Sequence, residues 1–160
     1  MKKNGAITVF VILLLPIAIF LFLRIFGRNE FHVPLIHQEK VEAPGECAFE
    51  YTAPYVVHDS VTNRLFEGSD APLVLVNFSG SAAVQNVVYN ELTQQEVRTV
   101  DARDLPQVPV PYKTCVFLIP ENMDLVVVDR ERRIRGYYNA SEKKDVDRLM
   151  GELNILLKKY

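Results

Sequence analysis

The chain has 160 residues, of which 49% are hydrophobic and 10% aromatic, enough for the core of one domain with short accessory segments. Its 18 Lys and Arg and 20 Asp and Glu give a formal net charge of −2. No long basic stripe runs through the chain, so the composition argues against nucleic-acid binding.

The first segment is apolar, and residues 4–23 carry no charged side chain. At 1.5 Å per residue a helix of this length spans about 30 Å, the thickness of a bilayer core. We therefore predict an amino-terminal tail and transmembrane anchor over residues 1–28. A cleaved signal peptide would have a shorter apolar region and a small-x-small cleavage site, which residues 22–28 do not offer.

The orientation of this anchor is barely decided by charge, because Lys2 and Lys3 face Arg24 and Arg28 across the span. A short tail ahead of a single span favours a domain outside the cytoplasm. We therefore expect a membrane-anchored, periplasmic or extracytoplasmic protein, in a compartment that permits disulfides.

Residues 29–53 are polar and interrupted by prolines, which predicts a stalk or linker ahead of a domain over residues 54–160. His32 and His37 lie in this stalk and are expected to be solvated. Residues 55–59 and 62–66 predict two short strands, with His58 at the turn between them.

Residues 73–76 form a continuous apolar run, typical of a strand buried on both faces of a sheet. A helix follows, with its apolar face formed by Ala83, Val84, Val87, Val88 and Leu92. The turn between them, residues 77–81, lies at the carboxyl end of the strand, where open α/β sheets place their chemistry. The expected role of Ser81 from its position alone is to cap this helix.

Three more strands are predicted over residues 96–101, 116–119 and 125–129, and a fourth over 134–138 closes an antiparallel hairpin with the strand before it. The last helix is expected to start at Ser141 as its N-cap. The hairpin turn carries several arginines, which indicate either an ordinary solvated turn or a site for acidic partners or lipid headgroups: Arg130, Arg132, Arg133 and Arg135. This order of elements predicts an α/β, thioredoxin-like fold with a mixed sheet flanked by helices.

The block Asp124–Tyr138, followed by Asp145–Leu149 and Leu156–Tyr160, resembles the end of the SCO/SenC proteins. Those are membrane-tethered thioredoxin-fold proteins that deliver copper or reducing equivalents during cytochrome oxidase assembly. The resemblance is good over residues 124–160, fair over 54–92 and poor between, where this chain is shorter. It implies a tethered thioredoxin-like domain that works among respiratory or other envelope complexes.

The family binds copper through a Cys-x-x-x-Cys pair after the central strand and a distant histidine. Aligning that motif on Phe78 places Ser81 and Gln85 where the cysteines belong, and Glu121 or Asn122 near the histidine position. Hydroxyl and amide groups do not replace thiolates for Cu(I), and a serine cannot cycle through a disulfide. The resemblance therefore implies a degenerate site, with no catalytic residue and no cofactor there.

Two cysteines remain, Cys47 and Cys115, far apart in the sequence. They are consistent with a structural disulfide or with two unpaired thiols, since their separation in space is not readable from the sequence. A relocated copper site built from both cysteines with His58 and Met123 is chemically possible, because thiolate, imidazole and thioether all suit Cu(I).

Two classes of function follow. The first is a non-catalytic binding or assembly module that kept the fold and lost the thiols. The second is a copper-binding or thiol-disulfide redox protein that uses Cys47 and Cys115.

Overall fold

The computed structural model describes residues 3–26, 33–41, 44–45, 47, 50–105 and 111–158. The chain divides into two compact units, Met1–Phe31 and His32–Tyr160. The first holds one helix, α1 (Lys3–Phe26), with Pro16 inside it. Its described apolar side chains are exposed, among them Ile12 at 68% and Phe20 at 63%. Among the residues that the structure describes, no helix is both long and apolar enough to cross a membrane.

The second unit is built on one mixed sheet of four strands in the order β2-β1-β3-β4. The strands are β1 (Leu73–Asn77), β2 (Val97–Asp101), β3 (Leu125–Asp129) and β4 (Ile134–Tyr138). β1 runs parallel to β2 and antiparallel to β3, and β3 forms an antiparallel hairpin with β4. Every residue of β1 and β3 is buried. The predicted α/β class with a mixed sheet flanked by helices is confirmed.

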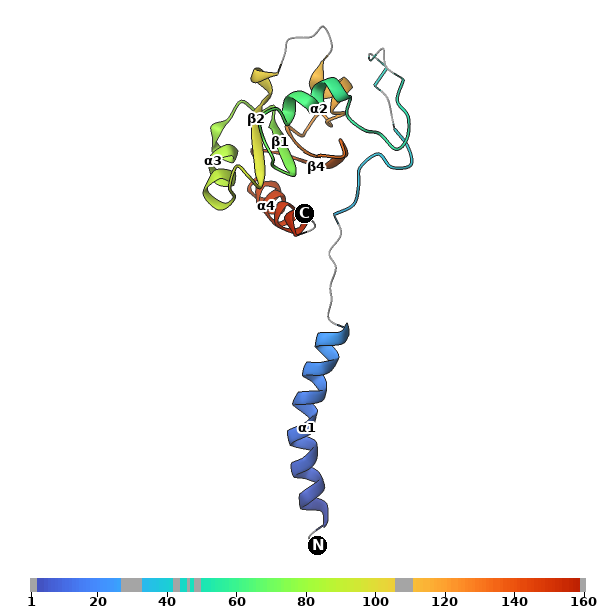
Figure 1. Cartoon of the computed structure of the whole chain (residues 1–160), viewed down its shortest axis with the longest axis vertical. Coiled ribbons are helices and arrows are strands. Elements are labelled where there is room, and N and C mark those ends of the chain that lie inside the picture. The colour runs from blue at the N-terminus through green and yellow to red at the C-terminus, as the bar shows by residue number, and fades with distance from the viewer. Residues whose placement is uncertain are drawn as a thin grey trace. The chain divides into compact units, whose positions relative to one another are not determined.

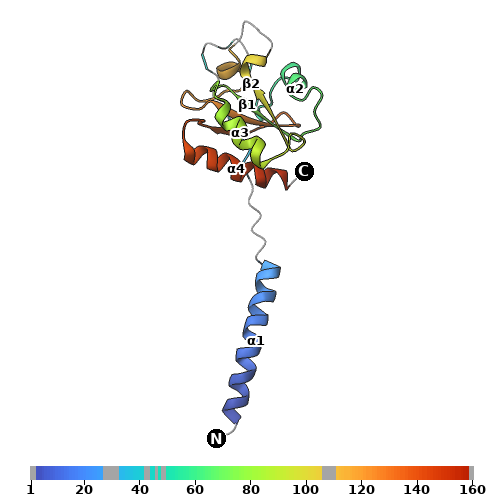
Figure 2. The same ribbon diagram turned by 90° about the vertical axis from the view of Figure 1, so that its left-hand side faces the viewer.

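Two helices, α3 (Ala82–Glu91) and α4 (Lys143–Leu157), cover one face of the sheet (Figure 1). Turned by 90°, α3 lies in front of the strands and α4 runs beneath them (Figure 2). α4 buries its predicted apolar stripe against Leu73, Leu125 and their neighbours on this face. The helix begins after Glu142, which makes no side-chain cap bond, so the prediction of Ser141 as its N-cap is wrong.

The opposite face is covered by α2 (Asp59–Leu65) and by the connection between β2 and β3. That connection contains a 3-10 turn, η1 (Ala102–Asp104), and a π-helical turn, η2 (Tyr112–Val116). It buries Val116, Phe117 and Ile119 against β1 and β3. This face of the sheet is therefore covered by short turns together with the short helix α2.

The strands predicted over residues 55–59, 62–66 and 116–119 are wrong. His58 instead caps α2, where its ring accepts a bond from Ser60 N–H. The buried residues Thr62 and Leu65 are spaced for one helical face rather than for a strand. Residues 116–119 are buried, but Leu118 has a positive φ of 52°, which bends the chain out of the extended conformation.

The predicted stalk packs in part against the sheet. Val33 is a core residue, and its carbonyl accepts a bond from buried Arg135 Nη2 at 3.2 Å. Ile36 N–H donates to Ile134 O at 3.2 Å. These stalk residues belong to the second compact unit, His32–Tyr160. Their contacts are made by single residues without periodicity, and Arg135 of β4 supplies the buried guanidinium that bonds Val33.

His37 is also partly buried, although it was expected to be solvated. Its Nε2 lies 3.1 Å from the hydroxyl of Tyr137, and its carbonyl accepts a bond from Tyr55 N–H at 3.0 Å. Because the Tyr137 hydroxyl already donates to Phe117 O, the imidazole is the donor in this contact. Burial lowers the pKa of His37, and a backbone hydrogen bond at Lys40 opposes that shift. His32 lies outside the described residues.

The hairpin arginines are engaged within the domain rather than gathered on a free basic surface. Arg130 donates to Ala71 O at 3.0 Å and to Ser69 O at 2.6 Å. Arg132 pairs with Asp59, and Arg133 pairs with fully buried Asp129 at 2.8 Å. These contacts connect the turn to the elements around it.

Gly136 lies under the ring of Tyr138, its neighbour on the same side of β4, and this contact gives the first prediction. A methyl group at 136 would come within 2.6 Å of Tyr138 Cζ and would overlap the hydroxyl. The ring is 1% exposed and its hydroxyl donates to Glu152 at 2.6 Å, so it cannot move away cheaply. We expect Gly136→Ala to destabilise the domain by about 1–3 kcal/mol in urea denaturation.

The matched control is Gly151→Ala. Gly151 lies inside α4 with nothing near its would-be Cβ within 4 Å. Alanine there should stabilise the domain by about 0.5–1 kcal/mol through helix propensity. Equal effects of the two substitutions would contradict the packing described for Tyr138.

Candidate functional site at the turn after the central strand

The turn after β1 is organised by Asn77, a fully buried amide at the end of an apolar strand. Its Oδ1 accepts bonds from Ser79 N–H at 2.9 Å and from the Ser79 hydroxyl at 2.6 Å. Its Nδ2 donates to Ser81 O at 2.8 Å. Gly80 has a φ of 68°, which closes the turn in the left-handed region that glycine adopts without strain.

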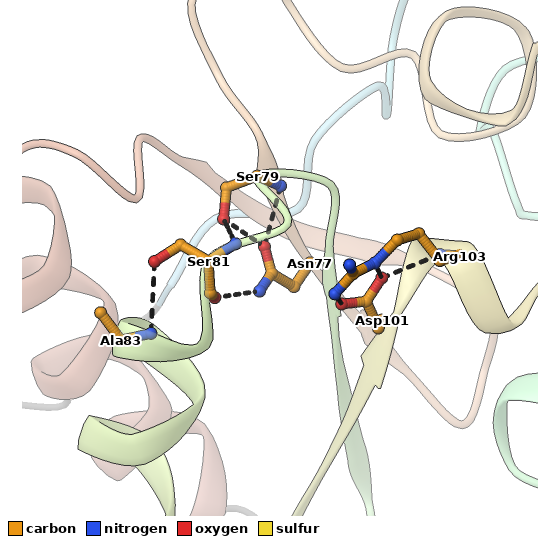
Figure 3. A network of polar contacts seen from close by, with 6 residues as sticks. All are labelled: Asn77, Ser79, Ser81, Ala83, Asp101 and Arg103. Carbon is orange, nitrogen blue, oxygen red and sulfur yellow. Dashed lines mark hydrogen bonds and ion pairs between the residues drawn. The ribbon is translucent and has the colours of Figure 1, made fainter.

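The two serines continue this network into α3 (Figure 3). The Ser79 hydroxyl oxygen accepts a bond from Ser81 N–H at 3.1 Å, and the Ser81 hydroxyl oxygen accepts one from Ala83 N–H at 3.3 Å. Ser81 is therefore the N-cap of α3, as its position suggested. Gln85 lies one turn into the helix and is half-buried.

A charged pair lies beside the turn, at the carboxyl end of β2. Asp101 is the register partner of Asn77 in the pairing of β1 with β2. Its carboxylate forms hydrogen bonds with Arg103 (Figure 3). Oδ1 accepts from Arg103 Nε at 2.8 Å and from its backbone N–H at 2.9 Å, and Oδ2 accepts from Nη2 at 2.6 Å. These hydrogen bonds lower the pKa of Asp101 to about 2.

Sequence reasoning missed Asn77, Asp101 and Arg103. The signals were present, because Asn77 ends an apolar run and precedes Ser79 in an Asn-x-Ser sequence that favours a side-chain-closed turn. Asp101 likewise ends an alternating run, two residues before Arg103. Only the parallel pairing of β1 with β2 brings these polar ends together.

The other predicted site residues lie elsewhere. Glu121 and Asn122 are exposed in the turn before β3, and Asn122 O accepts a bond from Asn139 Nδ2 at 3.1 Å. His58 is exposed at the start of α2, and Met123 packs at the edge of the core on the α2 face. In the described part of the chain, no group of three or more His, Cys, Asp and Glu side chains is placed to hold a metal.

Cys47 and Cys115 form a disulfide, with a sulfur–sulfur distance of 1.99 Å and a sequence separation of 68. Cys115 is 2% exposed in η2, and its carbonyl accepts a bond from the Tyr51 hydroxyl at 2.7 Å. η2 approaches the turn through the rings of Phe78 and Phe117, whose centroids are 5.6 Å apart. Within the described residues, the hydrogen bonds of the turn involve neither cysteine.

The chemistry of the turn follows from this geometry. Its amide and hydroxyls are used to close the loop and cap α3, and the adjacent carboxylate is held by an arginine. Ser81 has no imidazole among its described hydrogen-bond partners to activate it as a nucleophile. The arrangement is a rigid polar cap on the end of the central strand.

Comparison with known proteins adds no relative: no family model, curated protein or solved structure matches the chain.

The pair at the end of β2 gives the second prediction. Because the pKa of Asp101 lies at about 2, below its usual 3.8, the pair stabilises the fold above about pH 4 and loses this effect as the pH falls toward 2. Arg103→Ala removes the side-chain bonds but keeps the backbone one. We expect it to raise the Asp101 pKa part of the way to the usual value, measured by carboxyl ¹³C shifts against pH.

The control is Arg64→Ala, which removes an exposed arginine paired with Glu67 at 3.2 Å. It should leave the Asp101 titration unchanged. A wild-type Asp101 that titrates near 4 would contradict the bidentate pair.

Proposed function

We propose that this chain is a membrane-tethered, extracytoplasmic, thioredoxin-like protein related to the SCO/SenC family, and that it acts as a non-catalytic binding or assembly module. The observation that carries the proposal is the turn after β1. Where the family holds its two thiols, this chain has Ser81 as a helix cap and Gln85 on the helix, under a network closed by Asn77.

The thioredoxin-like assignment is supported by topology. β1, α3 and β2 form a βαβ unit, and β3, β4 and α4 form a ββα unit, and the two units share one mixed sheet. α3 and α4 pack on the same face of that sheet. This is the arrangement that the order of elements in the sequence predicts.

The extracytoplasmic location is supported by the disulfide. Cys47 and Cys115 are bonded, and such bonds persist in oxidising compartments. The anchor is proposed from the sequence, in which residues 4–23 form an uncharged, mostly apolar run. On this proposal α1 tethers the domain, and the partners belong to envelope or respiratory complexes.

A copper-binding or redox role is the second candidate, favoured by one observation: the two sulfurs are in bonding contact. Reduction would turn the pair into a dithiol, a ligand type that Cu(I) prefers. Cys115 is buried, so attack by an external thiol would have to begin at the partly exposed Cys47.

A thiol count combined with Cu(I) titration separates the two candidates. For the full chain in detergent we expect no free thiol before reduction and two after it. We also expect that neither form binds Cu(I) tightly against a competing chelator and that neither reduces a disulfide substrate. The Cys47→Ser, Cys115→Ser double variant, which has neither thiol, serves as the negative control.

Stoichiometric Cu(I) binding by the reduced protein that is lost in either single serine variant would overturn the non-catalytic proposal. It would establish the second candidate in its place.

The tether is tested by alkaline extraction of membranes from expressing cells. We expect the full chain to stay in the membrane pellet, because residues 4–23 carry no charge to oppose insertion. A chain lacking residues 1–28 should appear in the supernatant. Protease added outside the cytoplasmic membrane should degrade the domain of the full chain. Extraction of the full chain, or a domain protected on the cytoplasmic side, would contradict this part of the proposal.

A further inference from the structure

The outer edge of the sheet, β2, has backbone groups that are not used within the sheet. Phe78 N–H donates to Asp124 O at 2.8 Å, which shows that even-numbered residues of β1 face β3 and odd-numbered residues face β2. In the parallel register of β1 with β2, Arg98 and Val100 then face inward. Val97, Thr99 and Asp101 face outward. In agreement, Val97 N–H donates outside the sheet, to Thr93 O at 3.0 Å.

Thr99 is therefore the centre of an open strand edge. Neither its backbone N–H nor its carbonyl has a hydrogen-bond partner among the residues that the structure describes. Such an edge is completed by the backbone of another extended chain.

A groove runs along this edge, made of two cavities that share Glu67, Arg98 and Thr99. The larger has a volume of about 820 Å³ and extends over the loop 67–70, Tyr89, Gln94 and Gln95. The smaller, of about 250 Å³, continues past Val100 to Asp104 and Leu105. We call the two together the edge groove.

The walls of the edge groove are held in place by bonds from the strand itself. The Arg98 guanidinium donates to Glu67 O on one side, and Thr99 Oγ1 donates to the Tyr89 hydroxyl on the other. The loop and helix α3 thus flank β2.

The charges of the groove indicate which chain it suits. The Arg64 guanidinium pairs with the Glu67 carboxylate. The backbone carbonyl of Glu67 accepts a hydrogen bond from the Arg98 guanidinium. Asp70 in the larger cavity takes part in no ion pair among the described residues, and Asp104 in the smaller interacts electrostatically with Arg103; both carboxylates are exposed. Together with Glu67 they outnumber the two arginines that line the groove, Arg64 and Arg98, so the groove favours a cationic ligand.

From these observations we propose that the edge groove binds an extended peptide segment with basic side chains, which adds to β2 as a fifth strand. The inference rests on the proposed binding role and names its surface. Affinity comes from backbone bonds to Thr99, and the preference for basic residues comes from Asp70 and Asp104. A segment of about five residues matches the length of β2, at about 3.3 Å per residue.

The test uses the full chain in detergent and three labelled peptides: Lys-Val-Thr-Val-Lys, Glu-Val-Thr-Val-Glu and Lys-Val-Pro-Val-Lys, each with blocked ends. We expect saturable binding of the first by fluorescence anisotropy, with slower hydrogen exchange at the Thr99 amide. The acidic peptide should bind about tenfold more weakly or worse. The proline peptide, which lacks the central backbone donor, should also bind weakly.

Two protein variants locate the site. Thr99→Pro removes an outward N–H that the sheet does not use, so the fold should persist while binding is lost. The double variant Asp70→Lys, Asp104→Lys should lose the preference for the basic peptide without touching the sheet. Glu121→Lys is the control for a charge reversal away from the groove, because Glu121 is exposed in the turn before β3, and it should bind as the wild type does.

Equal binding of the three peptides, unchanged binding by the charge-reversed double variant, or no saturable binding by the wild type would overturn the inference. A sedimentation result in which two copies of the wild-type chain pair through their β2 edges would also overturn it. The thiol and copper measurements are independent of all these outcomes. Failure of peptide binding at the edge groove is therefore distinguished from failure of the non-catalytic proposal, because only the thiol and copper measurements test the latter.

Discussion

The complete burial of β1 is the constraint on which the rest of this domain depends. Its five residues are inaccessible, with alternate side chains in two separate cores and neighbours on both edges. A strand in that position can carry a polar side chain only if the side chain is fully hydrogen-bonded. Asn77 satisfies this condition by turning the chain back through Ser79 and Ser81 into α3. The burial of one strand therefore dictates the closed, polar form of the turn that follows it.

The face covered by α2 needs further stabilising contacts, because the connection from β2 to β3 packs only short turns against it. Three consecutive carbonyls at the end of η2, those of Cys115, Val116 and Phe117, each accept a tyrosine hydroxyl. The disulfide then ties the same segment to Cys47. Closing a loop of this length contributes about 4 kcal/mol by restricting the unfolded chain. Hydroxyls and a covalent bond replace the regular helix that would otherwise cover this face.

Periodicity predicted the parts of the fold that depend on it: β1, β2, the β3–β4 hairpin and the stripe of α4. It failed where a single contact decides the structure. Residues 59–65 are helical because Thr62 and Leu65 share one buried face, and residues 33–37 are docked because Arg135 and Tyr137 reach them. Of the site, the sequence indicated the turn and the cap at Ser81. Asp101 and Arg103 could not be placed, because they meet Asn77 only through the register of a parallel pair.

The contrast between the turn and the edge explains where binding energy is available in such a domain. At the turn, the polar groups of Asn77, Ser79 and Ser81 already bond one another, so a ligand would have to break internal bonds to replace them. At the edge, the Thr99 amide and carbonyl exchange only water for a peptide partner. The turn after β1 therefore offers a ligand little free energy of binding. The open edge of β2 is where this sheet can bond another chain without breaking internal hydrogen bonds, and the proposed binding role is placed there for that reason.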